Sequence, residues 1–278
     1  MSTKLYKKAT KVLREEGLLE FIWRGIGLGY RTTLRKVLPN IGFYTENNVN
    51  TREKSLLDRF FYIPFSNKPN QEGGIVSAHS ALTHKGDSVI IVGGGKGISA
   101  IRAAKIVGET GDVSIYEGGK ESIEEIHSTI GMNDISVNID IKHAVVGEER
   151  DVYWGDSEQA DKVSPKNLPT CDVLELDCEG SEIDILKDLP IRPRVIIVEL
   201  HPYNYETKPT KPLKLLSEYG YDVTLRFGHN GMSIDEKDLS TLLQNRYKWG
   251  DTVPESDARP PAVIAAVHNE PVSGKDRS

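Results

Sequence analysis

Short apolar runs alternate with amphipathic segments from residue 88 onward. Seven runs are predicted to be strands: 88–92, 113–116, 137–146, 173–176, 195–200, 223–227 and 263–267. Four segments between them have helical spacing: 98–107, 121–130, 181–189 and 212–219. Continuous apolar strands separated by helices are typical of a parallel sheet with both faces covered. We therefore expect an α/β fold with helices on both faces of its sheet.

A different pattern occupies the N-terminal part of the chain. Residues 3–16 and 18–38 are predicted to be helices, although three glycines weaken the second prediction. Residues 40–75 are predicted to be irregular around a helical piece at 52–61. The expected parts are a basic helical extension over 1–75, a catalytic domain over 76–268 and a disordered tail over 269–278.

The charge of the chain divides unevenly between these parts. The 278 residues carry a net charge of -6, whereas residues 1–38 hold nine Lys or Arg and three Glu, a balance of +6. The remainder must carry -12, which argues against a nucleic-acid binder with a basic main domain. Two interpretations of the basic segment stay open. Its helices dock on the catalytic domain and form part of an acceptor pocket, or they make peripheral contact with anionic lipid through Phe21 and Trp23.

Cellular location is predicted from what the sequence lacks. It contains no apolar run of roughly eighteen residues and no secretory signal pattern. Cys171 and Cys178 are predicted to be buried free thiols. We expect a cytoplasmic protein, peripheral at the inner membrane surface if the lipid interpretation holds.

A glycine-rich turn is the most informative segment of the chain. The apolar run 88–92 leads directly into four glycines and then a helix: Gly93, Gly94, Gly95 and Gly97. Glycine allows a sharp turn and a close approach of the backbone to a ligand. Glu117 ends the next strand, where a carboxylate can bind ribose hydroxyls. A ligand-free tight turn is the alternative, and residues 95–100 also fit the G-x-G-x-x-A fingerprint of an NAD(P)-dependent oxidoreductase.

A second motif, DVLELDCEGSE at residues 172–182, brings two carboxylates to the end of another strand. Asp177 and Glu179 follow the strand 173–176, and ligands of open α/β sheets bind at such carboxyl ends. A dehydrogenase has no evident use for this pair. The alternative is that either residue caps the following helix.

These segments together resemble the FkbM family of methyltransferases over roughly residues 85–205. The most specific parts are the acidic run at 177–182 and the Val-Glu-Leu-His-Pro run at 198–202. The resemblance implies a seven-stranded, Rossmann-like class I sheet closed by an antiparallel pair of late strands, with S-adenosylmethionine as methyl donor. It implies donor contacts from the residues of the glycine turn, Glu117, Gly118, Ala144 and Asp177. The sequence departs from the family at Ile91, where an acidic residue is usual, and at Gly95, often Asn.

Candidate catalytic groups lie beside this expected donor site. Methyl transfer to a hydroxyl needs a base, and His201, directly after the strand 195–200, is a candidate. A histidine before proline at a strand end is also commonly a loop residue. Glu199 and Asp177 are alternatives, as bases, orienting partners or ligands of a divalent cation. Glu179 is a further catalytic candidate, and no residue is assigned to a metal. The other histidines considered, His79, His84 and His229, are expected to be solvated.

The favoured function is S-adenosylmethionine-dependent O-methylation of a glycan, a glycolipid or another small hydroxyl or carboxyl acceptor. The alternatives are an NAD(P)-dependent oxidoreductase, from the glycine fingerprint, and a non-catalytic relative, from Ile91.

Overall fold

The computed structural model describes residues 18, 22, 25–26, 29–30, 33–34, 42–53, 72–147, 157, 159–228, 231–244 and 261–270. The chain divides into two compact units. The first comprises Met1–Tyr44 and Arg52–Lys68, and the second comprises Thr45–Thr51 and Pro69–Ser278. The domain boundaries expected at 75 and 268 stay a prediction.

In the first unit, residues 18, 22, 25–26 and 29–30 are helical, in agreement with the predicted helix 18–38. The Thr33 hydroxyl donates to the Gly29 carbonyl at 2.6 Å. The predicted helix 3–16 lies outside the described residues. Within the described part of the chain, no helix has the length and apolar character needed to cross a membrane.

The second unit is built on an eight-stranded sheet with the order β6-β5-β4-β3-β7-β8-β10-β9. The strands are β3 (Ser88–Val92), β4 (Asp112–Glu117), β5 (Ile139–Val146), β6 (Asp161–Val163), β7 (Val173–Leu176), β8 (Val195–Leu200), β9 (Tyr221–Gly228) and β10 (Ala262–His268). Strands β3 to β8 pair in parallel, and β10 lies antiparallel between β8 and β9. The expected α/β sheet and its late antiparallel pair are confirmed.

The expected number of strands was one too few. The additional strand, β6, pairs with the carboxyl end of β5 in the register Ala144↔Asp161 to Val146↔Val163. Three residues are too short to show a periodic pattern, so this segment was expected to be a loop.

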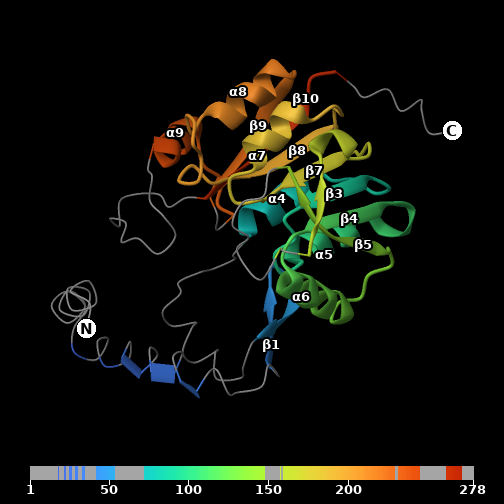
Figure 1. The fold of residues 1–278 in the computed structure, drawn as a ribbon, viewed down its shortest axis with the longest axis vertical. Helices are drawn as coiled ribbons and strands as arrows, with labels where there is room; N and C mark the ends of the chain where they lie inside the picture. The colour runs from blue at the N-terminus through green and yellow to red at the C-terminus, as the bar shows by residue number, and fades with distance from the viewer. Residues whose placement is uncertain are drawn as a thin grey trace. The chain divides into compact units, whose positions relative to one another are not determined.

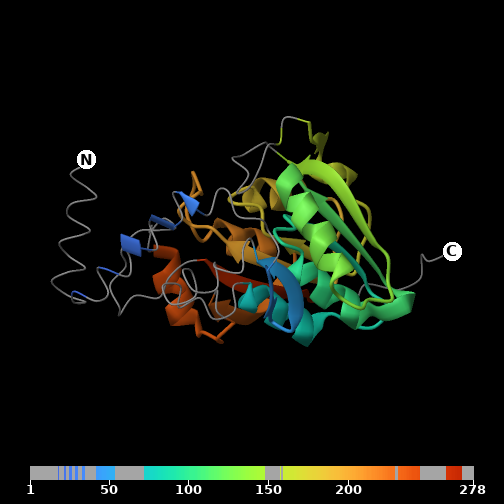
Figure 2. The same ribbon diagram turned by 90° about the horizontal axis from the view of Figure 1, so that it is seen from below.

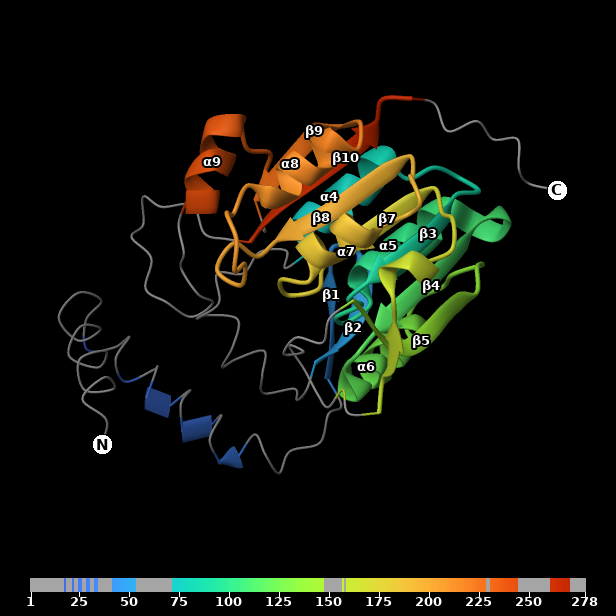
Figure 3. The same cartoon turned by 45° about the horizontal axis from the view of Figure 1, so that its top comes forward.

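Helices cover both faces of the sheet (Figures 1 and 3). One layer contains α4 (Gly73–Leu82), α5 (Ile98–Val107) and α6 (Lys120–Gly131), and the other contains α7 (Glu182–Asp188), α8 (Lys211–Glu218) and α9 (Glu236–Gln244). Alternate strand residues face alternate layers: Val89 and Ile91 pack with α4 and α5, whereas Ile90 and Val92 face the opposite core. Two short 3₁₀ turns lie between these elements: η2 (Gly108–Thr110) between α5 and β4, and η3 (Pro165–Asn167) between β6 and β7.

A two-stranded hairpin, β1 (Gly42–Glu46) and β2 (Val49–Glu53), precedes the sheet. It is the blue pair of strands in Figures 1 and 2. In the second unit, its residue Asn50 exchanges hydrogen bonds with the Asn133 side chain at 3.1 and 2.7 Å. The expectation of an irregular segment was wrong here, and the expected helical piece at 52–61 was wrong at residues 52–53, which are extended. Residues 54–61 lie outside the described residues.

Candidate active site

The glycine turn between β3 and α5 is shaped by close packing. Gly93, at φ +89°, lies against β7, so that a Cβ built there would be 1.7 Å from the Asp177 carbonyl oxygen. A Cβ at Gly94 would be 2.6 Å from the Ile115 side chain. Gly95 differs, because it is exposed and a Cβ there would meet only Glu72 Oε1, at 3.5 Å. The first two glycines are therefore required by the protein's own packing, and the open side of the turn lies at Gly95.

Glu117, at the end of β4, faces this turn. Its Oε2 accepts hydrogen bonds from the backbone N–H groups of Gly94 (2.8 Å) and Gly95 (3.2 Å), and its Oε1 accepts one from Gly119 (2.7 Å). The carboxyl group is buried, and burial raises the pKa of Glu117 above its ordinary value of 4.5, against the opposing effect of these hydrogen bonds. The structure thus brings Glu117 and the glycine turn together as expected.

Gly118 and Ala144, two expected donor contacts, lie in different surroundings. Gly118 is buried beside Glu117, and its carbonyl contacts His143 Nε2 at 3.0 Å. Ala144 lies within β5 with its side chain in the core that faces α7 and α8. Donor contacts by either residue stay a prediction.

The loop from β7 to α7 carries the expected acidic pair in a strained conformation. Glu179 has φ +51°, in the left-handed region that residues with a side chain seldom adopt. The Asn204 Nδ2 group donates to the Glu179 carbonyl (3.0 Å) and to its Oε2 (3.2 Å). A Cβ at the next residue, Gly180, would be 2.9 Å from the Asn204 Cβ. Asn204 therefore fixes both the backbone and the carboxylate of Glu179.

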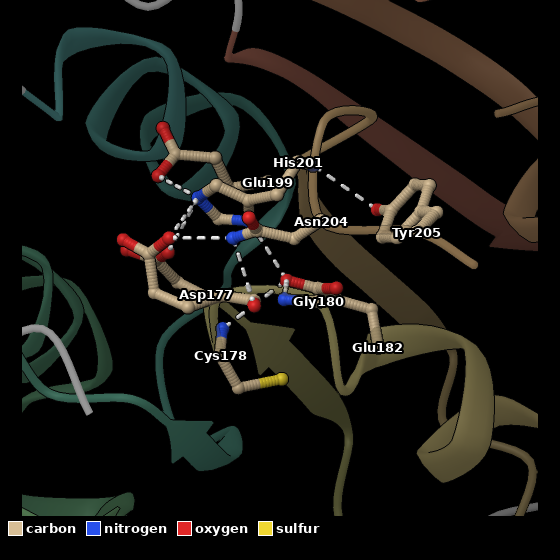
Figure 4. Close-up of polar contacts among 9 residues, drawn as sticks. Asp177, Cys178, Gly180, Glu182, Glu199, His201, Asn204 and Tyr205 are labelled. Carbon is tan, nitrogen blue, oxygen red and sulfur yellow. Dashed lines mark hydrogen bonds and ion pairs between the residues drawn. The ribbon is translucent and has the colours of Figure 1, made fainter. Parts of the chain in front are cut away.

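Asp177, Glu179, Glu199 and His201 meet at the carboxyl ends of β7 and β8. His201 Nε2 lies 3.5 Å from Glu199 Oε2, 3.6 Å from Asp177 Oδ1 and 3.8 Å from Glu179 Oε2. Figure 4 shows the side chains of Asp177 and Glu199 turned toward the imidazole ring from these two strands. The four residues selected from two separate sequence motifs thus form one acidic cluster, which we call the β7–β8 cluster.

The other nitrogen of His201 is held by a buried carboxylate. Nδ1 lies 2.8 Å from Glu182 Oε1, which also accepts from the backbone N–H groups of Gly180 (3.2 Å) and Cys178 (3.3 Å). The backbone N–H of His201 donates to the Tyr205 hydroxyl at 3.1 Å. The ring orientation is therefore fixed on two sides before any ligand binds.

Electrostatics differ across the β7–β8 cluster. Burial alone lowers the pKa of His201, but Glu182 and then Glu199 outweigh it and raise that pKa well above 6.5. Burial and the charge of Glu199 raise the pKa of Asp177. Burial likewise raises the pKa of Glu179 above 4.5. His201 is thus stabilised as a cation that must lose a proton before accepting one, and its role as base stays a prediction.

Three residues that orient this site did not emerge from the sequence motifs: Glu182, Asn204 and Tyr205. Glu182 lies within the quoted acidic run, but only the fold shows that it contacts His201. Asn204 and Tyr205 follow the Val-Glu-Leu-His-Pro run, and no local pattern connects them to the preceding strand.

A second buried histidine lies beneath the glycine turn. His79 was expected to be solvated, which was wrong, because it lies in α4, is fully buried and contacts Glu175 Oε2 at 2.6 Å. Its Nδ1 is 2.8 Å from the Thr83 hydroxyl. The expectation missed α4, whose first residues are glycines. His84 is exposed as expected, and His229 lies outside the described residues.

Comparison with family models gives a match over part of the chain. Residues 103–223 match the family model described as the methyltransferase FkbM domain. No curated protein matches the chain.

Similar solved structures include the following three. Aeropyrum pernix fibrillarin, solved with natively bound S-adenosyl-L-methionine, is 13% identical with a TM-score of 0.40, covering 81% of each chain. A Thermotoga maritima S-adenosylmethionine-dependent O-methyltransferase is 16% identical with a TM-score of 0.40, covering 82% of this chain and 78% of its own. TYW2 of P. horikoshii, in complex with MeSAdo, is 12% identical with a TM-score of 0.44, covering 82% and 70%. The protein is an S-adenosylmethionine-dependent methyltransferase, and over residues 103–223 it is similar to the methyltransferase FkbM domain.

Proposed function

We propose that the protein transfers a methyl group to an oxygen atom of a small hydroxyl or carboxyl acceptor, such as a glycan or glycolipid. One observation carries this proposal: the β7–β8 cluster adjoins the glycine turn. Gly93 lies against the Asp177 backbone, and the Asp177 N–H donates to the Val92 carbonyl at 2.9 Å. A donor bound at the turn and an acceptor bound at the cluster would therefore be neighbours.

The residues of the glycine turn fit a nucleoside. Backbone N–H groups on both sides of the Glu117 carboxylate hold it at the glycine turn, where it is positioned to meet a ribose hydroxyl. Gly95 leaves the turn open on its exposed side. When bound, S-adenosylmethionine supplies a methyl group activated by a sulfonium. The protein's part is to hold the acceptor oxygen in line with the methyl–sulfur bond.

Glu179 is the residue best placed to take the acceptor proton. Its side chain is 28% exposed, whereas those of Glu199 and His201 are 6% and 2% exposed. Its raised pKa makes the carboxylate a stronger base than an ordinary glutamate. In this mechanism the acceptor oxygen bonds to the methyl carbon, the methyl–sulfur bond breaks with its electrons left on sulfur, and the hydroxyl proton moves to Glu179.

Labelled methyl transfer to a panel of acceptors tests the proposal. The panel contains sugars, sugar-bearing lipids and hydroxy acids, with amines and RNA as comparison classes. Label that enters an ether or ester of the first three classes supports O-methylation. Label that enters only amines or RNA overturns it.

The N-terminal segment supports a lipid-linked acceptor. Leu18, Ile22, Ile26 and Leu34 in the first unit are between 46% and 62% exposed. The first three recur at a spacing of four residues, which places them on one side of a helix. Apolar residues among basic ones are characteristic of segments that lie at an anionic lipid surface. We therefore extend the proposal to peripheral contact of this segment with the inner membrane surface.

A further inference from the structure

The β7–β8 cluster contains more negative charge than methyl transfer to a hydroxyl needs. Its three carboxylates, together with that of the adjoining Glu182, lie around one imidazole ring. One proton acceptor is enough for the reaction, and Glu179 is best exposed for that role. Gathering several carboxylates in a largely buried place is costly unless positive charge offsets them.

Three possible ligand atoms of the cluster lie close together. One atom each from Asp177, Glu199 and His201 lie within 4.8 Å of one another. His201 Nε2 lies 3.5 Å from the Glu199 oxygen and 3.6 Å from the Asp177 oxygen. Two ligands bound to the same ion at about 2.1 Å and at a tetrahedral angle are about 3.4 Å apart. The observed separations therefore suit an ion inserted among the three atoms.

His201 has the surroundings of a metal-binding histidine. Its ring is almost fully buried and directs Nε2 into the cluster, while Nδ1 is held by Glu182 at 2.8 Å (Figure 4). A carboxylate on the distal nitrogen is the usual arrangement that fixes the tautomer of a ligating histidine. Glu182 is itself held by the backbone N–H groups of Cys178 and Gly180.

We propose that Asp177, Glu199 and His201 bind a divalent transition-metal ion at the carboxyl ends of β7 and β8. The imidazole ligand favours Mn²⁺ or Zn²⁺ over Mg²⁺ or Ca²⁺, which prefer sites built from oxygen alone. The ion replaces the positive charge of the protonated ring. In the reaction the ion would act as a Lewis acid that orients the acceptor oxygen beside Glu179. This use of the ion rests on the proposed function, whereas the binding of the ion to the protein does not.

Titration of the metal-stripped, full-length protein with Mn²⁺ tests the site, with Mg²⁺ as a comparison. We expect one Mn²⁺ per chain, bound more tightly than Mg²⁺. Glu199→Gln and Asp177→Asn preserve side-chain size and should each weaken Mn²⁺ binding by at least about tenfold. The control Glu218→Gln, on the exposed surface of α8, should bind as the wild type does. Circular dichroism of each variant verifies folding. The visible spectrum of the Co²⁺-bound protein should differ between His201→Gln and the wild type.

Absence of saturable Mn²⁺ and Zn²⁺ binding by the wild-type chain overturns the proposal. Wild-type affinity in both Glu199→Gln and Asp177→Asn also overturns it. S-adenosylhomocysteine binding, measured on the same metal-free samples, separates this inference from the proposed function. If Mn²⁺ binds at one site that requires Glu199 but S-adenosylhomocysteine does not bind, the metal site stands and the proposed function fails.

Discussion

Glu175 and Ile91 are register partners on the adjacent parallel strands β7 and β3. Ile91 occupies the position where the FkbM resemblance leads one to expect an acidic residue, and it packs in the core. The carboxylate lies instead on the neighbouring strand, where Glu175 is 1% exposed. It accepts a hydrogen bond from the Ser99 hydroxyl (2.8 Å) and pairs with His79 (2.6 Å). Glu175 thereby links β7 to α5, the helix that follows the glycine turn, and to α4.

Replacement of Glu175 should therefore destabilise the fold and the glycine turn together. Glu175→Ala leaves His79 buried without its carboxylate, and breaking such a buried pair costs about 3–5 kcal/mol in the free energy of unfolding. Urea denaturation measures this loss. The exposed Glu124→Ala serves as the control and should change stability by less than about 0.5 kcal/mol. Equal stability of the two variants would show that the buried network contributes little.

Gly93 and Gly131 should respond to alanine in opposite directions. A Cβ at Gly93 would collide with the Asp177 carbonyl at φ +89°, whereas at Gly131, in the last turn of α6, nothing lies within 4 Å. We expect Gly93→Ala to lose several kcal/mol of stability, on the order of a severe core substitution, and to lose donor binding. Gly131→Ala should be neutral or gain about 0.5–1 kcal/mol. Thermal unfolding of both variants checks this, and a stable Gly93→Ala would contradict the observed close packing of β3 against β7.

Acidification should weaken donor binding through Glu117. In the proposed donor site the ionised carboxylate accepts a hydrogen bond from ribose. Because the pKa of Glu117 is raised above 4.5, donor affinity should begin to fall at a higher pH than it would with an exposed glutamate. In the donor-free protein the same shift favours the fold below pH 4.5, and this contribution is lost as the pH rises through the raised pKa. Glu117→Gln should remove this pH dependence and reduce affinity about ten- to a hundredfold.

Calorimetric titration of S-adenosylhomocysteine across the acid range measures both effects. The control Glu124→Gln should follow the wild-type curve. A wild-type pH profile retained by Glu117→Gln would assign the titration to another group.

Lipid contact should depend on the apolar residues of the first unit. Replacing Leu18, Ile22 and Ile26 together with serine should reduce sedimentation with anionic vesicles, because their apolar area no longer inserts. Met232→Ser is a matched control, since Met232 is 66% exposed in the second unit. Unchanged binding of the triple variant, or of a chain lacking residues 1–38, would dismiss the membrane contact.

The apolar strands and their order could be predicted well from the sequence. Residues 88–92, 173–176 and 195–200 coincide with β3, β7 and β8, because strands buried on both faces are short, predominantly apolar runs. The helix 98–107 likewise coincides with α5. Elements without such a signal were missed. Strand β6 has three residues, α4 begins with two glycines, and α9 lies in a segment for which no element was predicted.

The acidic cluster could be predicted only in part for the same physical reason. Asp177 and His201 follow apolar strands whose carboxyl ends must meet at one edge, so their proximity follows from topology. The contacts of Asn204 with Glu179 and of His79 with Glu175 depend on packing between segments distant in sequence. No local period encodes such contacts.

Calorimetric titration of the full-length protein with S-adenosylhomocysteine and, separately, with NAD tests the central claim most directly. In the proposed mechanism a methyl-donor nucleoside binds at the glycine turn beside Glu117. We therefore predict that S-adenosylhomocysteine binds at one site per chain and that NAD does not bind. Binding of NAD alone would contradict the account and favour an oxidoreductase, and binding of neither would favour a non-catalytic relative.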